Sequence, residues 1–305
     1  MRPVYVIGAG MTRFGRSEWP LVDLAAAASL AALHHANLGK TPVNAVVVAN
    51  MGAGRINRQT AIASALVDRL SLWPAAAEAV ENGPASGASA VKVGYQAIAS
   101  GMADVVLVTG VEMMRAVDGL EATDFVASLS HPEAEYIYGV TLPSLAGLFA
   151  RLFMERHGVE RKHLALVAIK NHDNAMKNPY AHIHQTVTME GILTSPEAVV
   201  NNPPVAEPLH MFDCCPVSDG AAALVLASQD IAAKLGAPRV LVAGIGQATD
   251  THAVHERQDP TDLKAVRLAS AAAFDKAGLK PSDIDVAELH AAVTIREIAE
   301  SEAAG

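Results

Sequence analysis

The stretch VENGPASGASA, Val80 to Ala90, is the first place where the sequence could position a reactive group. It lies between an apolar run and an expected helix of small residues. At such a strand-to-helix corner the free N–H groups and the dipole of the helix start favour negative charge, so a nucleophile there would be activated. The corner residue is Pro84, which has neither a reactive atom nor an N–H group. Proline is also favoured in a first helical turn. The corner is therefore either a site without its nucleophile or an ordinary helix start.

Three other side chains could act as nucleophiles. Ser86 lies two residues beyond Pro84, which turns it to another face of the helix, and it has no evident His partner, so capping or packing is the simpler interpretation. Cys214 and Cys215 are the only cysteines. Free cysteine commonly behaves as a small hydrophobe, so we expect both to be buried. Two adjacent cysteines give no disulfide framework, which indicates a reducing compartment.

Histidines and carboxylates are the remaining candidates. The pairs at 182 and 184 and at 252 and 255 have the close spacing of metal ligands, but neither has a third ligand at a useful distance, so we expect no metal site. His290 follows an apolar run, where a parallel sheet would present ligand-binding residues, so it either contacts a ligand or simply hydrogen-bonds a backbone carbonyl. Glu112 and Asp219 lie at the ends of expected strands and are interpreted as structural. The polar stretch from Asn171 to Pro179 either shapes a binding site or caps a helix.

Composition restricts the class of protein. The chain has 305 residues, of which 51% are hydrophobic, 18% charged and 4% aromatic, as expected for helices layered on a buried sheet. The net charge of −9 argues against nucleic-acid binding as the main task, because phosphate contacts need clustered Lys and Arg. No basic and apolar signal begins the sequence, and no apolar run approaches the roughly 20 residues of a membrane span. We therefore expect no membrane contact and a cytoplasmic location.

Apolar runs and helical segments alternate, which predicts an α/β fold with parallel strands and helices on both faces. A less regular stretch, residues 113–204, is expected to be a layer inserted over the sheet. The expected strands are 4–7, 44–50, 75–80, 104–110, 219–228, 238–246 and 286–289, and the expected helices are 20–36, 59–70, 84–100, 142–157, 161–176, 229–235 and one from about Val293.

The sequence also repeats itself. PVYVIGAG at residues 3–10 matches PRVLVAGIG at residues 238–246, and an Ala-rich helix follows each. Two similar α/β halves are the natural inference, and the second stops before the strand, helix and strand that complete the first. The G-x-G of the first copy suggests a dinucleotide site only weakly, because Arg13 stands where the third glycine of that motif belongs.

Five motifs in order carry a resemblance to a known family. They are IGAGMTRFGR, ENGPASGASAVKVGYQAIASGMADVVLVTGVEMM, NHDNAMKNPYAH, FDCCPVSDGAAALVL and ELHAAVTIREI. With them the chain resembles the thiolase superfamily, and within it the sterol-carrier-type thiolases. The resemblance implies a layered fold of two βαβαβαββ halves, the second truncated here, and dimers or dimers of dimers. It also implies coenzyme A thioesters as substrate or ligand, with no covalently bound cofactor.

The resemblance implies three parts. The N-terminal thiolase half would comprise residues 1–117 and 203–232, the inserted loop domain residues 118–202, and an incomplete C-terminal half residues 233–305. Family members condense or cleave acyl-CoA through a cysteine at the start of a central helix, aided by a second cysteine and a histidine.

Three departures from the family pattern follow. The family reads E-N-G-C-A-S-G where this chain has Pro84, so the nucleophile is lost or replaced. His290, whose family counterpart contacts the thioester oxygen, is retained, but Ala291, Ala292 and Val293 replace the D-A-F or D-C-F that follows it. The family segments with the base histidine and second cysteine lie beyond residue 305, and His131-Pro132 does not match their context.

The resulting hypothesis is an acyl-CoA-binding protein of acyltransferase lineage without ordinary thiolase turnover. One alternative is a retro-aldolase acting on a β-hydroxyacyl-CoA in steroid or lipid side-chain degradation. Another is a non-catalytic subunit that assembles with an active thiolase-like chain or with a partner containing an OB-fold, for example through an exposed strand at residues 75–80. A fragment or a redesigned sequence is the last alternative. The sequence singles out no residues for binding coenzyme A.

Overall fold

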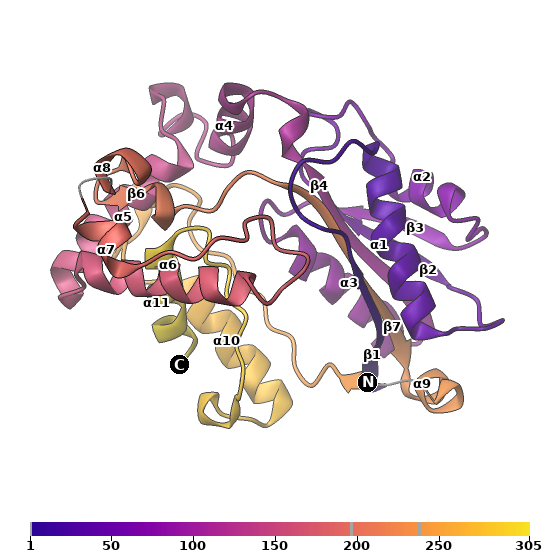
Figure 1. The fold of residues 1–305 in the computed structure, drawn as a ribbon. Helices are drawn as coiled ribbons and strands as arrows, with labels where there is room; N and C mark the ends of the chain where they lie inside the picture. The colour runs from indigo at the N-terminus through magenta and orange to yellow at the C-terminus, as the bar shows by residue number, and fades with distance from the viewer. Residues whose placement is uncertain (1, 196–197, 237–238) are drawn as a thin grey trace. The chain divides into compact units, whose positions relative to one another are not determined.

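The computed structural model describes residues 2–195, 198–236 and 239–305. They form two compact units (Figure 1). Unit 1 comprises Met1–Ala122 and Val217–Ala243, and unit 2 comprises Thr123–Pro216 and Gly244–Gly305. No helix among the described residues is both long enough and apolar enough to cross a membrane.

Unit 1 is built on a six-stranded mixed sheet of order β3-β2-β4-β7-β1-β8. Parallel pairing joins β2 to both β3 and β4, as predicted, whereas β7 runs antiparallel to both β4 and β1. It follows that β1, β2, β3 and β4 all run in one direction, so their carboxyl ends share one edge of the sheet. The strands are β1 (Val4–Met11), β2 (Ala45–Ala49), β3 (Ala76–Val80), β4 (Val105–Met113), β7 (Asp219–Ser228) and β8 (Val240–Leu241).

Helices cover both faces of this sheet, as the sequence predicts (Figure 1). On one face lie α1 (Leu21–Ala36) and α2 (Ile62–Arg69), and on the other lies α3 (Ser86–Ser100). Alternate residues of the central strands point to opposite faces, so Val46 and Val48 pack with α1 while Val47 packs with α3. This double burial explains why β2 reads as a continuous apolar run. A short helix, α9 (Gln229–Leu235), follows β7.

The G-x-G of β1 serves close packing. A Cβ atom on Gly8 or Gly10 would clash with backbone carbonyl oxygens of Ala32 and Ala28 in α1. Only glycine allows the helix to approach the strand this closely. The motif thus has a packing role that requires no dinucleotide.

The predicted internal repeat is visible in unit 2, where two glycines make the same close contact with a helix that Gly8 and Gly10 make in unit 1. Gly244 and Gly246 press against α10 (Lys264–Ala277), where a Cβ atom on either would clash with carbonyl oxygens of Ala273 and Ala269. Glycines spaced by two residues against an Ala-rich helix are therefore common to both copies of the repeat.

Unit 2 is mainly helical within its described residues. Its core includes Phe153, Leu164, Leu209, Val293 and Ile295. The elements are α5 (Leu142–His157), α6 (Arg161–Ala175), α7 (Met189–Leu193), α8 (Ala198–Asn201), the hairpin β5 (Pro204–Ala206) and β6 (Leu209–His210), α10 and α11 (Thr294–Ala304), with α4 (Gly119–Ala127) spanning the junction from unit 1.

Two predicted strands differ from the structure. Of residues 238–246, only Val240 and Leu241 form a strand, and Pro238 lies outside the described residues. Residues 286–289 are irregular, and the Val286 side chain is 80% exposed. The reason is that the described part of unit 2 has no sheet beyond the β5–β6 hairpin, so this apolar segment has no neighbouring strand with which to pair.

Candidate functional site

The corner at Val80 to Ala90 is a tight turn between β3 and α3. Gly83 has a φ of +52°, and the N–H groups of Ala85 and Ser86 donate to the carbonyl oxygens of Asn82 (3.1 Å) and Gly83 (3.1 Å). The helix itself begins at Ser86, so the prediction that it begins at Pro84 is wrong by two residues. Pro84 occupies the second position of the turn closed by Gly83 and Ser86, which its fixed φ favours and where no N–H is needed.

Ser86 holds this corner together. Its side chain is buried, and Oγ donates to the Gly83 carbonyl (2.6 Å) while accepting from the N–H of Asn82 (2.8 Å). A second serine, Ser89, accepts from the Asn82 side-chain amide at 2.9 Å. The Ser86 hydroxyl is therefore committed to backbone groups of the turn, which favours the packing interpretation over a nucleophilic role, whereas no side chain caps the start of α3.

Glu112 stabilises the loop that follows β2. Its carboxylate accepts hydrogen bonds from the Asn50 side chain (3.0 Å) and from the N–H groups of Met51 (3.0 Å) and Gly52 (3.1 Å). Burial raises the pKa of Glu112 and outweighs these hydrogen bonds, which act in the opposite direction. The structural role expected for this strand-end residue is confirmed, and Asp219 at the start of β7 likewise accepts from backbone N–H groups.

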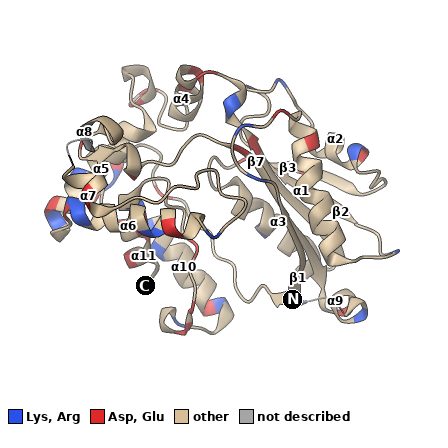
Figure 2. Ribbon diagram, in the orientation of Figure 1, with Lys and Arg blue, Asp and Glu red and all other residues tan. Residues whose placement is uncertain are grey.

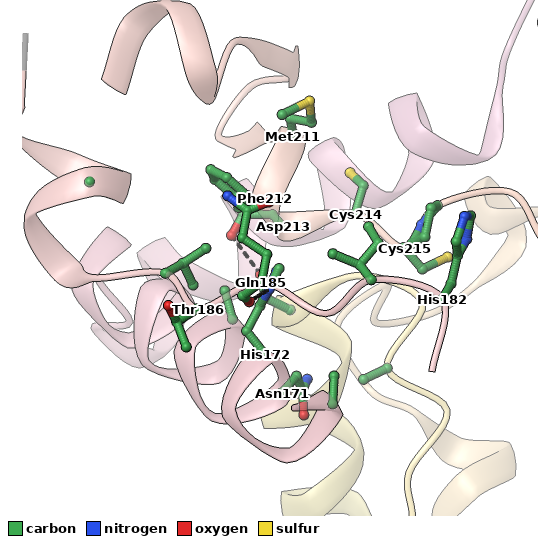
Figure 3. Close-up of a pocket in the computed structure, with 18 of the residues that line it drawn as sticks. Asn171, His172, His182, Gln185, Thr186, Met211, Phe212, Asp213, Cys214 and Cys215 are labelled. Carbon is green, nitrogen blue, oxygen red and sulfur yellow. Dashed lines mark hydrogen bonds between the residues drawn. The ribbon is translucent and has the colours of Figure 1, made fainter. Parts of the chain in front are cut away.

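Unit 2 contains a pocket of about 920 Å³ (Figure 3). It lies among α6, the loop after it and the segment from Met211 to Pro216. Asn171 and His172 line it, so the polar stretch of which they are part does help to shape a cavity. His172 is oriented by a 2.6 Å hydrogen bond between its Nδ1 and the Gln185 carbonyl, and by an edge contact with the Phe212 ring. The volume of the pocket suits a small-molecule ligand.

A buried carboxylate that the sequence did not single out fixes one wall of the pocket. Asp213 is 3% exposed and pairs with Arg161 at the start of α6 (2.7 Å). It also accepts from the Thr294 hydroxyl at the start of α11 (2.8 Å) and from the N–H of His210 (2.8 Å). The only sequence signal was its place directly before the cysteine pair, because its side-chain partners, Arg161 and Thr294, are 52 and 81 residues away.

The two cysteines differ in exposure. Cys214 is half-buried against the core of unit 2, whereas Cys215 is exposed, so the expectation of a buried pair is wrong for Cys215. Burial, together with the charge of Asp213 and the neighbouring thiol, raises the pKa of Cys214 to about 11. Such a thiol is protonated at neutral pH and is a poor nucleophile.

His290 is exposed, in an irregular segment that adjoins the pocket. The following residue, Ala291, lines the pocket, and Ala292 accepts a hydrogen bond from the N–H of Cys215 (3.0 Å). The structure thus brings the segments of His290 and Cys215 together within unit 2. Pro84 belongs to the other unit, unit 1.

The histidines considered as metal-ligand pairs make separate contacts. His184 contacts the Asn178 carbonyl (2.8 Å) and His252 contacts the Leu129 carbonyl (3.1 Å), while His182 lines the pocket. In the parts of the chain that the structure describes, no three His, Cys, Asp or Glu side chains are grouped as metal ligands would be.

Comparison with known families matches both parts of the chain. A model of the thiolase N-terminal domain matches residues 4–230, and a model of the domain described as thiolase C-terminal domain-like matches residues 246–305.

Individual relatives agree. Acetyl-CoA acetyltransferase of Methanothermobacter thermautotrophicus is 39% identical over 300 residues, which are 98% of this chain and 76% of that protein. Sterol carrier protein 2 of Oryctolagus cuniculus is 30% identical over 320 residues, covering 99% of this chain and 56% of that protein. Among solved structures, the Ltp2-ChsH2(DUF35) aldolase superposes with a TM-score of 0.81 at 25% identity, over 99% of this chain and 77% of that one.

Replacing Ser86 tests whether its hydroxyl is structural. Ser86→Ala removes the acceptor of the part-buried N–H of Asn82, while the Gly83 carbonyl keeps the N–H of residue 86 as its donor, so we expect the free energy of unfolding to fall by about 1 kcal/mol. Ser100→Ala, at the exposed far end of α3, is the matched control and should change it by less than about 0.5 kcal/mol. Denaturant unfolding measures both, and equal effects of the two substitutions would contradict the assigned role.

Proposed function

Because the chain belongs to the thiolase superfamily, we propose that it binds an acyl-CoA thioester at the Val80–Ala90 corner without forming an acyl-enzyme. The observation that carries this proposal is Pro84, which occupies the corner where the family resemblance puts the nucleophilic cysteine. A proline offers no lone pair or ionisable hydrogen to attack a thioester carbonyl. The corner nevertheless leads into the first turn of α3, and the backbone N–H groups of a helix start favour the partly negative thioester oxygen.

Neither Ser86 nor Cys214 is suited to act as a nucleophile in place of a cysteine at residue 84. Ser86 already donates its hydroxyl hydrogen to the Gly83 carbonyl. In unit 2, a pKa of about 11 leaves Cys214 almost entirely protonated at neutral pH. These observations support binding without the covalent step.

Restoring the cysteine tests the proposal directly. We expect the wild-type protein to gain no acyl mass with acetyl-CoA or acetoacetyl-CoA. In the Pro84→Cys variant, the introduced sulfur can attack the thioester carbon and expel the coenzyme A thiolate, so one acyl group should remain on the protein. Intact-protein mass spectrometry after brief incubation measures this.

The native thiols must be removed for a clear result. Cys214→Ala and Cys215→Ala together leave the introduced thiol as the only one in the Pro84→Cys variant, so any adduct is assigned without ambiguity. A burst of free coenzyme A with acyl mass on the wild-type protein would overturn the proposal.

A second candidate activity is retro-aldol cleavage, which the similarity to a solved aldolase favours. A base removes the proton from the β-hydroxyl group, the Cα–Cβ bond breaks, and its electron pair moves onto the thioester as an enolate. Cβ leaves as a carbonyl, and the enolate takes a proton at Cα. No covalent intermediate is needed, so Pro84 is no obstacle, and we assign His290 the contact with the thioester oxygen.

Cleavage of a β-hydroxyacyl-CoA tests this alternative. Release of a ketone such as acetone together with a shortened acyl-CoA, such as propionyl-CoA, would support it. His290→Ala should then lower the rate about a hundredfold, because it removes stabilisation of the enolate oxygen. His34→Ala, an exposed histidine in α1, should leave the rate unchanged. Chromatography of the products decides, and absence of cleavage under all conditions excludes the activity.

For assembly we propose a homodimer formed through β3. This strand lies at the edge of the sheet and carries one charged residue, Glu78, among alanines and a valine. An open apolar edge of this kind is a template for pairing with another chain. A non-catalytic role with a thiolase-like or OB-fold partner would use the same edge, and the small number of cysteines suits a cytoplasmic setting.

Sedimentation analysis tests the dimer. The wild type should sediment as a dimer, and Ala79→Lys, which adds like charges along the paired edges, should shift it to monomer. Leu30→Lys places the same charge on an exposed residue of α1 and should leave the dimer intact. A monomeric wild type, or a dimer broken only by Leu30→Lys, would contradict this arrangement.

A further inference from the structure

A cluster of arginines lies at one edge of the unit 1 sheet. It is formed by exposed residues on three loops, all of them arginine and none lysine: Arg13 and Arg16 after β1, Arg55 and Arg58 after β2, and Arg115 after β4. Figure 2 shows Lys and Arg positions in blue on the loops at this edge. We refer to these five residues as the arginine edge.

Sheet topology explains why distant parts of the sequence meet here. Because β1, β2 and β4 run in one direction, the loops that follow them leave the same edge. Because β4 and β7 lie between β2 and β1, the loop after β2 and the loop after β1 begin three strand spacings apart, or about 14 Å. The corner with Pro84 follows β3 and leaves this same edge.

Asp219 fixes the first and third loops to each other. Its two carboxylate oxygens accept from the N–H of Ser17 (2.9 Å) and from the N–H of Arg115 (2.7 Å). The backbone of Gly15 also pairs with Asp219 in both directions, at 3.0 and 2.7 Å. One fully buried carboxylate therefore holds Arg16 and Arg115 on neighbouring, hydrogen-bonded backbone.

The second loop is tied to the end of β4 in a similar way. Glu112 accepts from the N–H groups of Met51 and Gly52, and the Asn57 side chain donates to the Met113 carbonyl (3.3 Å). Arg58, beside Asn57, has a φ of +53°, a conformation that costs a residue with a side chain about 1 kcal/mol or more. The fold keeps this arginine despite the strain.

Charge also separates the two units. Unit 1 has equal numbers of acidic and basic residues, so the whole net charge of −9 belongs to unit 2. Five of the cations of unit 1 are at the arginine edge, where Glu112 and Asp219 already accept N–H groups. Glu18 and Asp118 lie on the same loops and Glu81 lies on the Pro84 corner, so with Glu112 and Asp219 five carboxylates balance the five arginines at this edge. The carboxylates of Glu112 and Asp219 are held by backbone N–H groups.

We propose that the arginine edge binds a phosphorylated anion. Guanidinium groups present a rigid fork of donors that matches phosphate oxygens, which explains the use of arginine throughout. The proposed function supplies one source, the phosphates of coenzyme A, and this part of the inference rests on that function. A free diphosphate or nucleotide is the other source with the same chemistry.

Calorimetric titration of the wild-type chain with inorganic pyrophosphate tests the site itself. We expect saturable binding that weakens as salt rises. Arg13→Ala with Arg16→Ala should weaken it at least tenfold, since each removes a charged donor. Arg58→Gly should also weaken it while leaving stability unharmed, because glycine accepts the positive φ. Lys40→Ala, on an exposed residue at the opposite edge of the sheet, should change affinity less than about twofold.

The source is identified by titrating coenzyme A, dephospho-coenzyme A, ADP and pantetheine. If coenzyme A supplies the phosphates, it should compete with pyrophosphate and lose affinity in the arginine variants, whereas pantetheine should not. ADP binding without coenzyme A binding would favour a free nucleotide and would count against the proposed function, but not against this site. Pyrophosphate binding that is absent, or unchanged by the arginine substitutions, overturns the inference even where acyl-CoA still binds.

Discussion

The common direction of β1, β2, β3 and β4 is the constraint on which unit 1 depends. It follows from β7, which returns to the sheet antiparallel to both β4 and β1. Four loops consequently leave one edge, and Asp219 and Glu112 fix three of them through backbone N–H groups. The corner with Pro84 is the fourth. Both the proposed thioester site and the arginine edge exist because of this arrangement.

Pro84 suits the turn it occupies, and this bears on the proposed absence of a nucleophile at this corner. Two backbone N–H to carbonyl hydrogen bonds close the turn, and the Ser86 hydroxyl adds hydrogen bonds to Asn82 and Gly83. None of these bonds involves a side chain at position 84. The corner can therefore hold this backbone shape with a proline at residue 84. Binding at a helix start uses backbone N–H groups, and a proline at residue 84 removes only that residue's own N–H while those of the residues after it stay in place.

Local patterns predicted much of the fold. The five longer strands of unit 1, the helices α5 and α6 of unit 2 and the repeat could be read from apolar runs, caps and paired glycines, because these depend on nearby residues. The segment 286–289 failed because an apolar run becomes a strand only with a neighbour to pair with. Asp213 was missed for a similar reason, since its partners Arg161 and Thr294 are remote in sequence. Motifs marked Pro84 and His290, whose roles stay predictions, and the stretch from Asn171, which lines a pocket, yet only the structure showed that Ser86 is committed to the backbone.

The central claim is that the corner still receives a thioester although the covalent step is lost. A crystal structure of the chain with a non-hydrolysable acyl-CoA tests it most directly. The account predicts an intact acyl-CoA whose carbonyl oxygen lies within hydrogen-bonding distance of backbone N–H groups at the start of α3, beside Pro84. Electron density that places the acyl group elsewhere, with the corner closed by protein side chains, would contradict it.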